Sequence, residues 1–476
     1  MDDITSFEQI IGSQNIITAE QDKIGYLEDW RGNFTGSAQA VLLPRSTEHV
    51  SQILAHADAQ NQIIVTQGGN TGLVGGGIPD KSGNAFILST ARMNTVRDIS
   101  EVNLSMTAEA GCILEQIHTI TEAKNLYFPL NLAAKGSCTI GGNLATNAGG
   151  LNVVRYGTTR NLCLGIEVVL MGGRVMNLLT PLRKDNTGYD LKDLFIGSEG
   201  TLGIITAASL KLFPLPTVRS TALAGVRDID AAVELLGALQ KKSGEKVEAF
   251  EIMPGILLDI VSKQFPNIPM PLSPMPEFMV LMEIASTNDE DGQPDSEGAI
   301  PLTALMEQFL ADNFETGLVT DAVIAQNETQ RKQLWDIREH SPEATKQESW
   351  PVNTDISVTR ADFAAFYKDA TIEVKSVYPD ARICGYGHLG DGNVHFNVLE
   401  REGGDPNWPE KRDAVKHAIY NALSKVNGSI SAEHGIGQMK VDQLKEVKDP
   451  VALEVMHQIK QSLDPKGLLN PGKILG

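Results

Sequence analysis

The sequence is poor in cysteine, in basic residues and in long apolar runs. Its four cysteines, Cys112, Cys138, Cys163 and Cys384, form no CxxC pair, which argues against a zinc knuckle or a disulfide framework and favours a reducing compartment. With 40 Lys and Arg against 60 Asp and Glu the formal net charge is -20, and no basic stripe offsets it, so nucleic-acid binding is not expected. No apolar run approaches the roughly 18 residues of a membrane span. We therefore expect a large globular protein without an integral membrane segment.

Targeting signals of the common kinds are also missing from the amino terminus. Met1-Asp2-Asp3-Ile4 is acidic, and it is followed neither by the basic and apolar segments of a signal peptide nor by an Arg-rich transit helix. The expectation that follows is a cytoplasmic location.

The 476 residues suffice for two or three domains, and their pattern indicates mixed α and β structure. In Phe213-Pro214-Leu215-Pro216 two prolines interrupt both helix and sheet, so we expect a domain junction there. Apolar periodicity and turn signals place the other elements. Strands are expected over 63–66, 86–90, 166–170, 175–179, 278–284, 384–386 and 394–399, and helices from Ser46 to Ala57 and over 112–124, 327–339 and 361–375.

Three glycine-rich runs stand out in the first half. The run 68–77 follows a predicted strand, and its backbone N–H groups can close on an anion such as a pyrophosphate, although a lone run of this kind is as often a flexible turn. It matches neither GxGxxG nor GxxxxGK[ST]. The run 134–150 adds small hydroxyl and amide side chains that can lie against a planar cofactor, and 197–206 leads into an apolar strand. Three runs at these intervals favour a cofactor over turns.

The second run and its neighbours closely resemble the FAD-linked D-2-hydroxyacid dehydrogenases, which are vanillyl-alcohol-oxidase-type flavoproteins. The D-2-hydroxyglutarate and D-lactate dehydrogenase types look closest, and the resemblance extends from about residue 40 to the end. It rests on the segments Phe128-Pro129-Leu130-Asn131, Lys135-Gly136-Ser137-Cys138, Ala145-Thr146-Asn147-Ala148-Gly149-Gly150, Arg155-Tyr156-Gly157, Lys184-Asp185-Asn186-Thr187-Gly188-Tyr189-Asp190-Leu191 and Phe195-Ile196-Gly197-Ser198-Glu199-Gly200-Thr201-Leu202-Gly203.

The resemblance implies an α+β fold. It consists of a two-subdomain FAD-binding domain over 1–215, an α+β substrate or cap domain over 216–435, and a segment over 436–476 that returns to the FAD domain. Some relatives attach the flavin through a histidine in the first run, where this chain has Asn70, so non-covalent FAD is implied. The residues implied to bind FAD are Gly68, Gly69, Asn70, Thr71, Gly72, Ser137, Thr139, Gly141, Gly142, Thr146, Ala148, Gly149, Tyr156, Glu199, Gly203 and Ile205.

Two histidines and an acidic residue in the second half have the character of metal ligands. His388 and His395 flank a Gly-Asp-Gly-Asn turn, and Glu433 follows about 40 residues later. Two imidazoles and a carboxylate can hold a divalent ion with open positions for substrate, but from spacing alone structural histidines are equally expected. The family resemblance implies that His388, His395 and Glu433 bind Zn²⁺ or Mn²⁺.

The same resemblance implies roles for three further residues. His434 is a candidate base for the substrate hydroxyl, with a packing role as the rival, because imidazole changes protonation near neutral pH. Arg338 resembles the carboxylate clamp of the family, although by itself it would more often be a solvated helix charge. Asn397, which shares a strand face with His395, is expected to donate or accept a hydrogen bond with substrate.

The function implied is oxidation of a D-2-hydroxy acid to the 2-oxo acid, with the metal on the hydroxyl and carboxylate and hydride transfer to flavin N5. The electron acceptor, a flavoprotein, quinone or other species, is not identified, and a homodimer is among the arrangements left open. The main alternative is a metal-dependent hydrolase or oxygenase that uses the His/His/Glu site without flavin. A flavin-binding scaffold without catalysis would not need all four residues His388, His395, Glu433 and His434.

Two departures from the 2-hydroxyglutarate-type pattern bear on substrate choice. Asn353 stands where such relatives often carry a lysine that can meet a second carboxylate, and Pro342 replaces a hydroxyl residue. Both favour a smaller or neutral side chain, such as that of lactate, unless a basic residue from another loop takes the place of the lysine.

Overall fold

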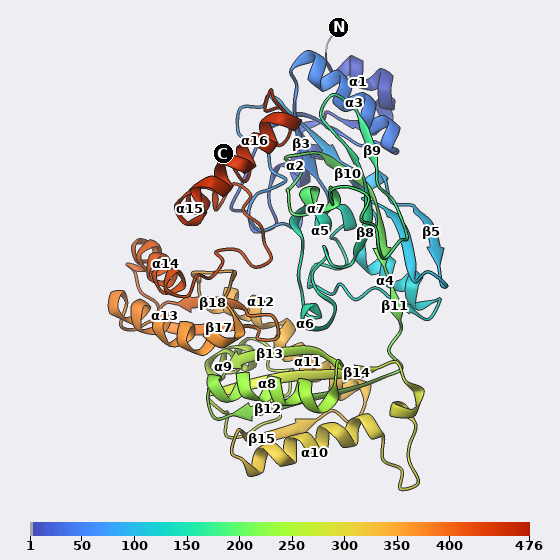
Figure 1. Cartoon of the computed structure of the whole chain (residues 1–476). Helices are drawn as coiled ribbons and strands as arrows, with labels where there is room; N and C mark the ends of the chain where they lie inside the picture. The colour runs from blue at the N-terminus through green and yellow to red at the C-terminus, as the bar shows by residue number, and fades with distance from the viewer. Residues whose placement is uncertain (1–2) are drawn as a thin grey trace. The chain divides into compact units, whose positions relative to one another are not determined.

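The computed structural model describes residues 3–476, so Met1 and Asp2 of the acidic amino terminus lie outside the described residues (Figure 1). The chain divides into two compact units. The first comprises Met1–Gly149, Gly157–Leu215 and Glu433–Gly476, and the second comprises Gly150–Tyr156 and Pro216–Ala432. The proline-rich segment expected as a junction is therefore one of the places where the chain passes from the first unit to the second.

The first unit contains a four-stranded sheet in which the three longer strands are parallel. Helices α1 and α3 cover it, and Phe7, Ile53 and Leu54 are fully buried between helices and strands. Ser46 caps α3 by accepting a hydrogen bond from His49 N. In order the strands are β1 (Ile16–Ile17), β2 (Ala38–Leu42), β4 (Ala85–Ser89) and β3 (Ile63–Gln67), and the helices are α1 (Asp3–Ile11), α2 (Glu20–Leu27) and α3 (Thr47–Gln60).

A five-stranded antiparallel sheet forms the other half of the first unit. Its β8–β9 hairpin turns through Gly172 and Gly173, whose φ angles of 83° and 84° confirm the predicted glycine turn. The strand order is β5 (Val96–Ser100), β6 (Ser105–Glu109), β10 (Ile204–Lys211), β8 (Cys163–Val169) and β9 (Val175–Asn177); β7 (Leu126–Tyr127) pairs with β11 (Phe213–Pro214). The helices are α4 (Leu114–Glu122), α5 (Ile140–Thr146), α7 (Lys192–Phe195), α15 (Val441–Val447) and α16 (Pro450–Leu463).

The carboxyl-terminal segment belongs to the first unit. Leu469 bridges Ile64 at the edge of the parallel strands, and Lys460 Nζ donates to Thr201 O at 2.8 Å. The red helices α15 and α16 of Figure 1 are therefore attached to the same unit as the blue strands.

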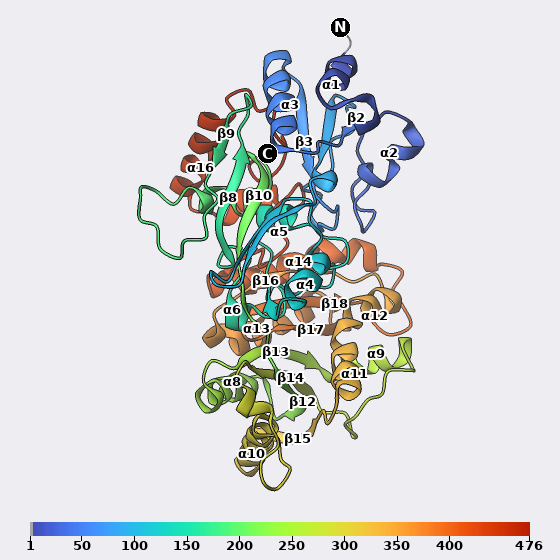
Figure 2. The same cartoon turned by 90° about the vertical axis from the view of Figure 1, so that its right-hand side faces the viewer.

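The second unit is built on a seven-stranded antiparallel sheet. Helices α8 and α10 lie on one side of β12, β13 and β14, and α9 and α11 lie on the other (Figure 2). The strand order is β15 (Val319–Ile324), β12 (Val218–Val226), β14 (Phe278–Ser286), β13 (Val247–Pro254), β17 (Arg382–His388), β18 (Asn393–Leu399) and β16 (Ile356–Ser357). The helices are α6 (Val153–Tyr156), α8 (Ile229–Ser243), α9 (Gly255–Gln264), α10 (Pro301–Glu315), α11 (Glu328–Glu339), α12 (Ser341–Glu348), α13 (Phe363–Val377) and α14 (Trp408–Lys425).

Three glutamates are buried within this sheet, and each has a basic partner. Glu248 accepts from Arg155 and Arg219, Glu283 from Arg331, and Glu251 from Arg338. Buried carboxylates are tolerated only when they are paired and hydrogen-bonded, so these contacts constrain how the elements around the sheet pack.

Most elements expected from the sequence are confirmed. The predicted helices correspond to α3, α4, α11 and α13, and the strands to β3, β4, β8, β9, β14, β17 and β18. All four cysteines are buried and free. No helix within residues 3–476 is both long enough and apolar enough to cross a bilayer.

The cap of α8 provides a test of the second unit. Asp228 accepts a hydrogen bond from Ala231 N at 2.7 Å, which satisfies an N–H group at the start of the helix. Asp228→Ala should lower the free energy of unfolding by about 1 kcal/mol, visible as a fall in melting temperature, whereas Asp228→Asn keeps the acceptor and should change it little. Equal melting temperatures for the two variants would contradict the role of this cap.

Candidate active site

The first two glycine runs are in direct backbone contact in the first unit. A Cβ placed on Gly69 would lie 2.0 Å from Ser137 O, and one on Gly68 would lie 2.5 Å from Thr139 Oγ1. Side chains cannot fit at these distances, so glycine is required for the loop after β3 to rest on the second run. The two runs therefore form one surface.

The third run joins this surface through the carboxyl-terminal segment. Asn470 Nδ2 donates to Glu199 O at 2.7 Å and to Gly76 O at 3.2 Å, so one side chain links the first and third runs. A Cβ on Gly200 would lie 3.3 Å from Thr66, beside the first run. The three glycine runs thus lie together in the first unit.

Several buried polar atoms beside these runs make no hydrogen bond to any described residue. They are Thr66 Oγ1, Thr139 Oγ1, Asn143 Oδ1 and Asn470 Oδ1. Buried polar groups in native proteins are nearly always satisfied, so unsatisfied atoms gathered at a glycine cradle indicate a polar guest. Backbone N–H groups, amides and hydroxyls are the donors and acceptors that a dinucleotide uses.

The cofactor candidates occupy different places. All except Tyr156 lie in the first unit. Tyr156 lies in the second unit and donates to Glu248 Oε1 at 2.7 Å, and Asn70 Nδ2 donates to Gly25 O and Glu28 O. Glu199 is buried, and its carboxylate holds backbone N–H groups.

The carboxylate of Glu199 anchors the segment that follows His434. Its oxygens accept from Ile436 N at 2.7 Å and from Gly437 N at 2.8 Å, while burial raises the pKa of this carboxyl. A Cβ on Gly149 would lie 2.7 Å from Glu433 Oε1, so the end of the second glycine run faces this glutamate. Within the first unit, Glu433 and the segment after it therefore adjoin the glycine runs.

The two candidate metal-binding histidines lie on neighbouring strands of the second unit. His388 is the last residue of β17, and His395 on β18 pairs directly with Tyr386. The two imidazole centroids are 5.7 Å apart with ring planes at 81°. Because strand residues alternate between faces, both rings lie on one face of the sheet, and Asn397 shares it, as the sequence predicts.

A buried carboxylate connects His388 to Arg338. Glu251 Oε1 accepts from His388 Nδ1 at 2.6 Å, and its Oε2 accepts from Arg338 Nε at 2.8 Å. The guanidinium lies over the Tyr386 ring, 4.8 Å from its centroid. Burial alone would raise the pKa of the Glu251 carboxyl, but the charges of His388 and Arg338 lower it to about 2. Arg338 is thus a buried and oriented charge rather than a solvated one.

The two positions that depart from the 2-hydroxyglutarate-type pattern lie near the substrate candidates in the same unit. Pro342 is the second residue of α12, one turn after Arg338, and it is exposed. Asn353 is also exposed, and the N–H of its neighbour Thr354 donates to Asn397 Oδ1 at 3.3 Å. Pro342 is therefore close in the chain to Arg338, and Asn353 is next to a residue that bonds to Asn397. Both Arg338 and Asn397 are expected to contact substrate.

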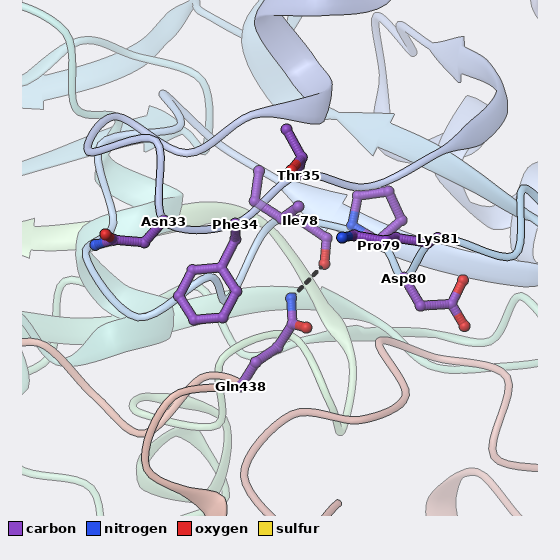
Figure 3. Close-up of a pocket in the computed structure, with 8 residues that line it drawn as sticks. All are labelled: Asn33, Phe34, Thr35, Ile78, Pro79, Asp80, Lys81 and Gln438. Carbon is purple, nitrogen blue, oxygen red and sulfur yellow. Dashed lines mark hydrogen bonds between the residues drawn. The ribbon is translucent and has the colours of Figure 1, made fainter. Parts of the chain in front are cut away.

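A pocket of about 290 Å³ lies in the first unit beyond the end of the first glycine run (Figure 3). Gln438 Nε2 donates there to Gly75 O at 2.9 Å and to Ile78 O at 2.8 Å, the second bond being drawn in Figure 3. No predicted cofactor, metal or catalytic residue lines it. The lining residues are Asn33, Phe34, Thr35, Ile78, Pro79, Asp80, Lys81 and Gln438.

Comparison with known proteins decides the family. A family model described as FAD binding domain matches residues 38–179, and one described as FAD linked oxidases, C-terminal domain, matches residues 215–474. The chain is 41% identical over its whole length to a probable mitochondrial D-2-hydroxyglutarate dehydrogenase of Oryza sativa subsp. indica, covering 82% of that protein. It is 34% identical to a D-2-hydroxyglutarate dehydrogenase of Stutzerimonas stutzeri, covering 99% of this chain and 98% of the other.

The chain belongs to the FAD-linked D-2-hydroxyacid dehydrogenases.

Solved structures confirm the fold of this dehydrogenase. p-Cresol methylhydroxylase with substrate bound superposes with a TM-score of 0.74 at 15% identity, covering 99% of this chain and 96% of that one. 4-Ethylphenol oxidase from Gulosibacter chungangensis gives 0.72 at 17%, with the same coverage. The α+β fold of the vanillyl-alcohol-oxidase type is therefore confirmed. The prediction of a flavin-dependent enzyme is confirmed as well, so the alternative of a flavin-free hydrolase or oxygenase is rejected.

The first unit of the dehydrogenase fits FAD. The contact of Gly69 with Ser137 O brings backbone close to backbone, as a pyrophosphate cradle needs, and the unsatisfied atoms of Thr66, Thr139 and Asn143 supply polar partners. The Glu199 carboxylate, which lies beside these runs, is occupied with the backbone N–H groups of Ile436 and Gly437 and so does not compete for the same donors.

Three residues that matter to this arrangement were not singled out from the sequence in these roles: Glu251, Asn470 and Tyr386. A signal existed for Glu251, because it lies with Glu248 in an otherwise apolar strand whose residues are all buried. A carboxylate in such a strand must have partners. Nothing local indicates which partners these are.

The contact between the first two glycine runs gives a testable prediction. Gly69→Ala adds a methyl group that meets Ser137 O, so it should push the runs apart and lower the FAD content of purified protein severalfold. The measurement is the ratio of flavin absorbance to protein absorbance. Gly237→Ala, in α8 with no atom within 4 Å of the added Cβ, is the control and should retain FAD. Unchanged FAD content in Gly69→Ala would show that the cradle lies elsewhere.

Proposed function

We propose that this dehydrogenase oxidises D-2-hydroxyglutarate, or a D-2-hydroxy acid close to it, to the 2-oxo acid. The observation that carries the proposal is the Arg338 guanidinium, buried beside the histidine pair, with its Nε on Glu251 and neither Nη nitrogen bonded to a described residue. A guanidinium presented in this way is suited to a carboxylate, which it can bind through two parallel hydrogen bonds. The names of relatives that match along nearly the whole chain support the substrate class.

We also propose that His388, His395 and Glu433 bind a divalent ion, Zn²⁺ or Mn²⁺. The adjacent imidazoles of the second unit support this, and so does the hydrogen bond of His388 Nδ1 with Glu251, because a neutral imidazole that donates from Nδ1 has its lone pair on Nε2. Glu433 follows directly after Ala432, the last residue of that unit. Such an ion would act as a Lewis acid toward the hydroxyl and carboxylate of the substrate.

Three further residues of the chain have roles in substrate binding and proton transfer in this proposal. Arg338 would hold the substrate carboxylate, and Asn397 would add a hydrogen bond from the same face of the sheet. His434 would take the proton of the hydroxyl, because imidazole is a base near neutral pH. FAD, when bound, supplies an acceptor for the hydrogen on C2. An electron acceptor, such as a flavoprotein or quinone, would then reoxidise the enzyme.

A second substrate, D-lactate, is favoured by one specific observation. Asn353 and Pro342, which flank Asn397 and Arg338, lack the lysine and the hydroxyl that a second carboxylate would use. D-Lactate has no second carboxylate, so this enzyme would not need those groups to bind it.

Anaerobic titration of the FAD-loaded protein tests the proposal. D-2-Hydroxyglutarate should bleach the oxidised-flavin band, and L-2-hydroxyglutarate should not; D-lactate and D-malate rank the alternatives. Removal of metal by a chelator should abolish bleaching, and added Zn²⁺ or Mn²⁺ should restore it. Bleaching by D-lactate but not by D-2-hydroxyglutarate would select the second substrate, and no bleaching by any D-acid would remove the proposal.

The role of Arg338 can be tested by a conservative change. Arg338→Lys keeps the charge but loses the fork of donors, so the KM for the hydroxy acid should rise about 10- to 100-fold while FAD content stays the same. Arg331→Lys is the matched control, since Arg331 lies in the same helix but pairs with Glu283. Equal effects of the two substitutions would mean that Arg338 acts only through stability.

A further inference from the structure

Glu251 occupies a position where a carboxylate is costly. It lies in β13 between Ala249 and Met253, which share its face and pack in the apolar core with α11. Its exposed fraction is 0%. A buried charge of this kind persists only when its oxygens are fully hydrogen-bonded. Here both oxygens are engaged, one by His388 and the other by Arg338.

The bond to His388 determines which ring nitrogen carries the proton. Glu251 and His388 are direct cross-strand partners of β13 and β17, which brings the carboxylate to Nδ1. An ionised carboxylate can only accept, so Nδ1 must donate. The neutral ring is then held in the tautomer whose Nε2 has a lone pair for a cation.

The bond to Arg338 determines the plane of the guanidinium. Nε is fixed on Glu251 Oε2, and the group lies over the Tyr386 ring. Two contacts fix the plane of this planar group, and with Nε engaged by Glu251 the pair of Nη nitrogens is the fork that remains for a second carboxylate. This is the end of the guanidinium that binds a carboxylate through two bonds.

We propose that Glu251 is a positioning residue that serves both binding groups at once. It holds His388 in the cation-binding tautomer and holds Arg338 with its Nη groups presented to the substrate carboxylate. One carboxylate thereby couples the orientation of a metal ligand to that of the substrate clamp. The inference rests on the proposed function, because it assigns Glu251 to the metal and substrate groups named there.

The substitution Glu251→Gln separates this role from simple packing. Glutamine has the same shape, but its amide offers one oxygen acceptor and one NH₂ donor. The donors His388 Nδ1–H and Arg338 Nε–H both require an acceptor, so the amide can serve only one of them. Either His388 takes the other tautomer or Arg338 loses its anchor.

A matched control lies on the neighbouring strand. Glu283 in β14 is also buried, and it accepts from Arg331 at 2.8 and 3.0 Å, from Trp335 Nε1 at 2.9 Å and from Thr221. Glu283→Gln removes the same charge from the same sheet without touching His388 or Arg338. It measures the loss of stability that any such change produces.

The experiment is a calorimetric titration of ZnCl₂ into metal-free, FAD-loaded protein. Glu251→Gln should bind Zn²⁺ about 10- to 100-fold more weakly than the unsubstituted protein, and Glu283→Gln within about threefold of it. The KM for the hydroxy acid should rise in Glu251→Gln and not in Glu283→Gln. Glu251→Asp keeps the charge and both acceptors but withdraws them by one methylene, so its Zn²⁺ affinity should be intermediate; it also provides a folded variant should the glutamine fail to fold.

The outcomes are distinguishable. Zn²⁺ affinity and KM unchanged in Glu251→Gln and Glu251→Asp would overturn the inference while leaving the metal site in place. Equal weakening in Glu251→Gln and Glu283→Gln would overturn it as well, because a general loss of stability would then explain both. If the unsubstituted protein and His388→Ala bind Zn²⁺ equally, the proposed metal site itself fails, and the positioning role fails with it.

Discussion

The close approach of backbone to backbone at the glycine runs is the constraint on which the first unit depends. Gly69 of the first run lies against Ser137 O of the second run at a distance that leaves no room for a Cβ. Gly149, near the end of the second run, faces Glu433. Because these positions accept no side chain, the loop after β3, the second run and the carboxyl-terminal segment form one surface. The glycine runs and the segment that carries His434 are thus parts of the same packing arrangement.

The second unit relies on paired buried charges instead. Glu248, Glu251 and Glu283 lie in one sheet, and they pair with Arg155 of α6 and with Arg338 and Arg331 of α11. Such pairs add little stability over apolar residues of similar size, but each one specifies a single arrangement because a lost partner leaves a buried charge. In this unit they direct arginine and histidine side chains rather than add to the core.

Family membership and local structure bear on different parts of the chemistry. Membership establishes an FAD-linked D-2-hydroxyacid dehydrogenase. In the proposed function, the side chain at C2 of the substrate is selected by a few positions near Arg338 and Asn397. Asn353, in the loop after α12, and Pro342, in the first turn of α12, are both exposed, so they can vary without disturbing buried packing. In that proposal, substrate choice is separable from the reaction itself.

The sequence by itself determined the family, the three glycine runs, most helices and strands, and the shared face of His395 and Asn397. These follow from local spacing, since periodicity of 2 or 3.6 residues records which face is buried. It did not indicate that Glu251 would bond to His388, 137 residues away, that Asn470 would link two glycine runs, or that Tyr156 would belong to the second unit. Those contacts are decided by the register of β13 against β17 and by the return of the chain to its first unit. Strand register and chain return produce no periodic pattern of residues in the sequence.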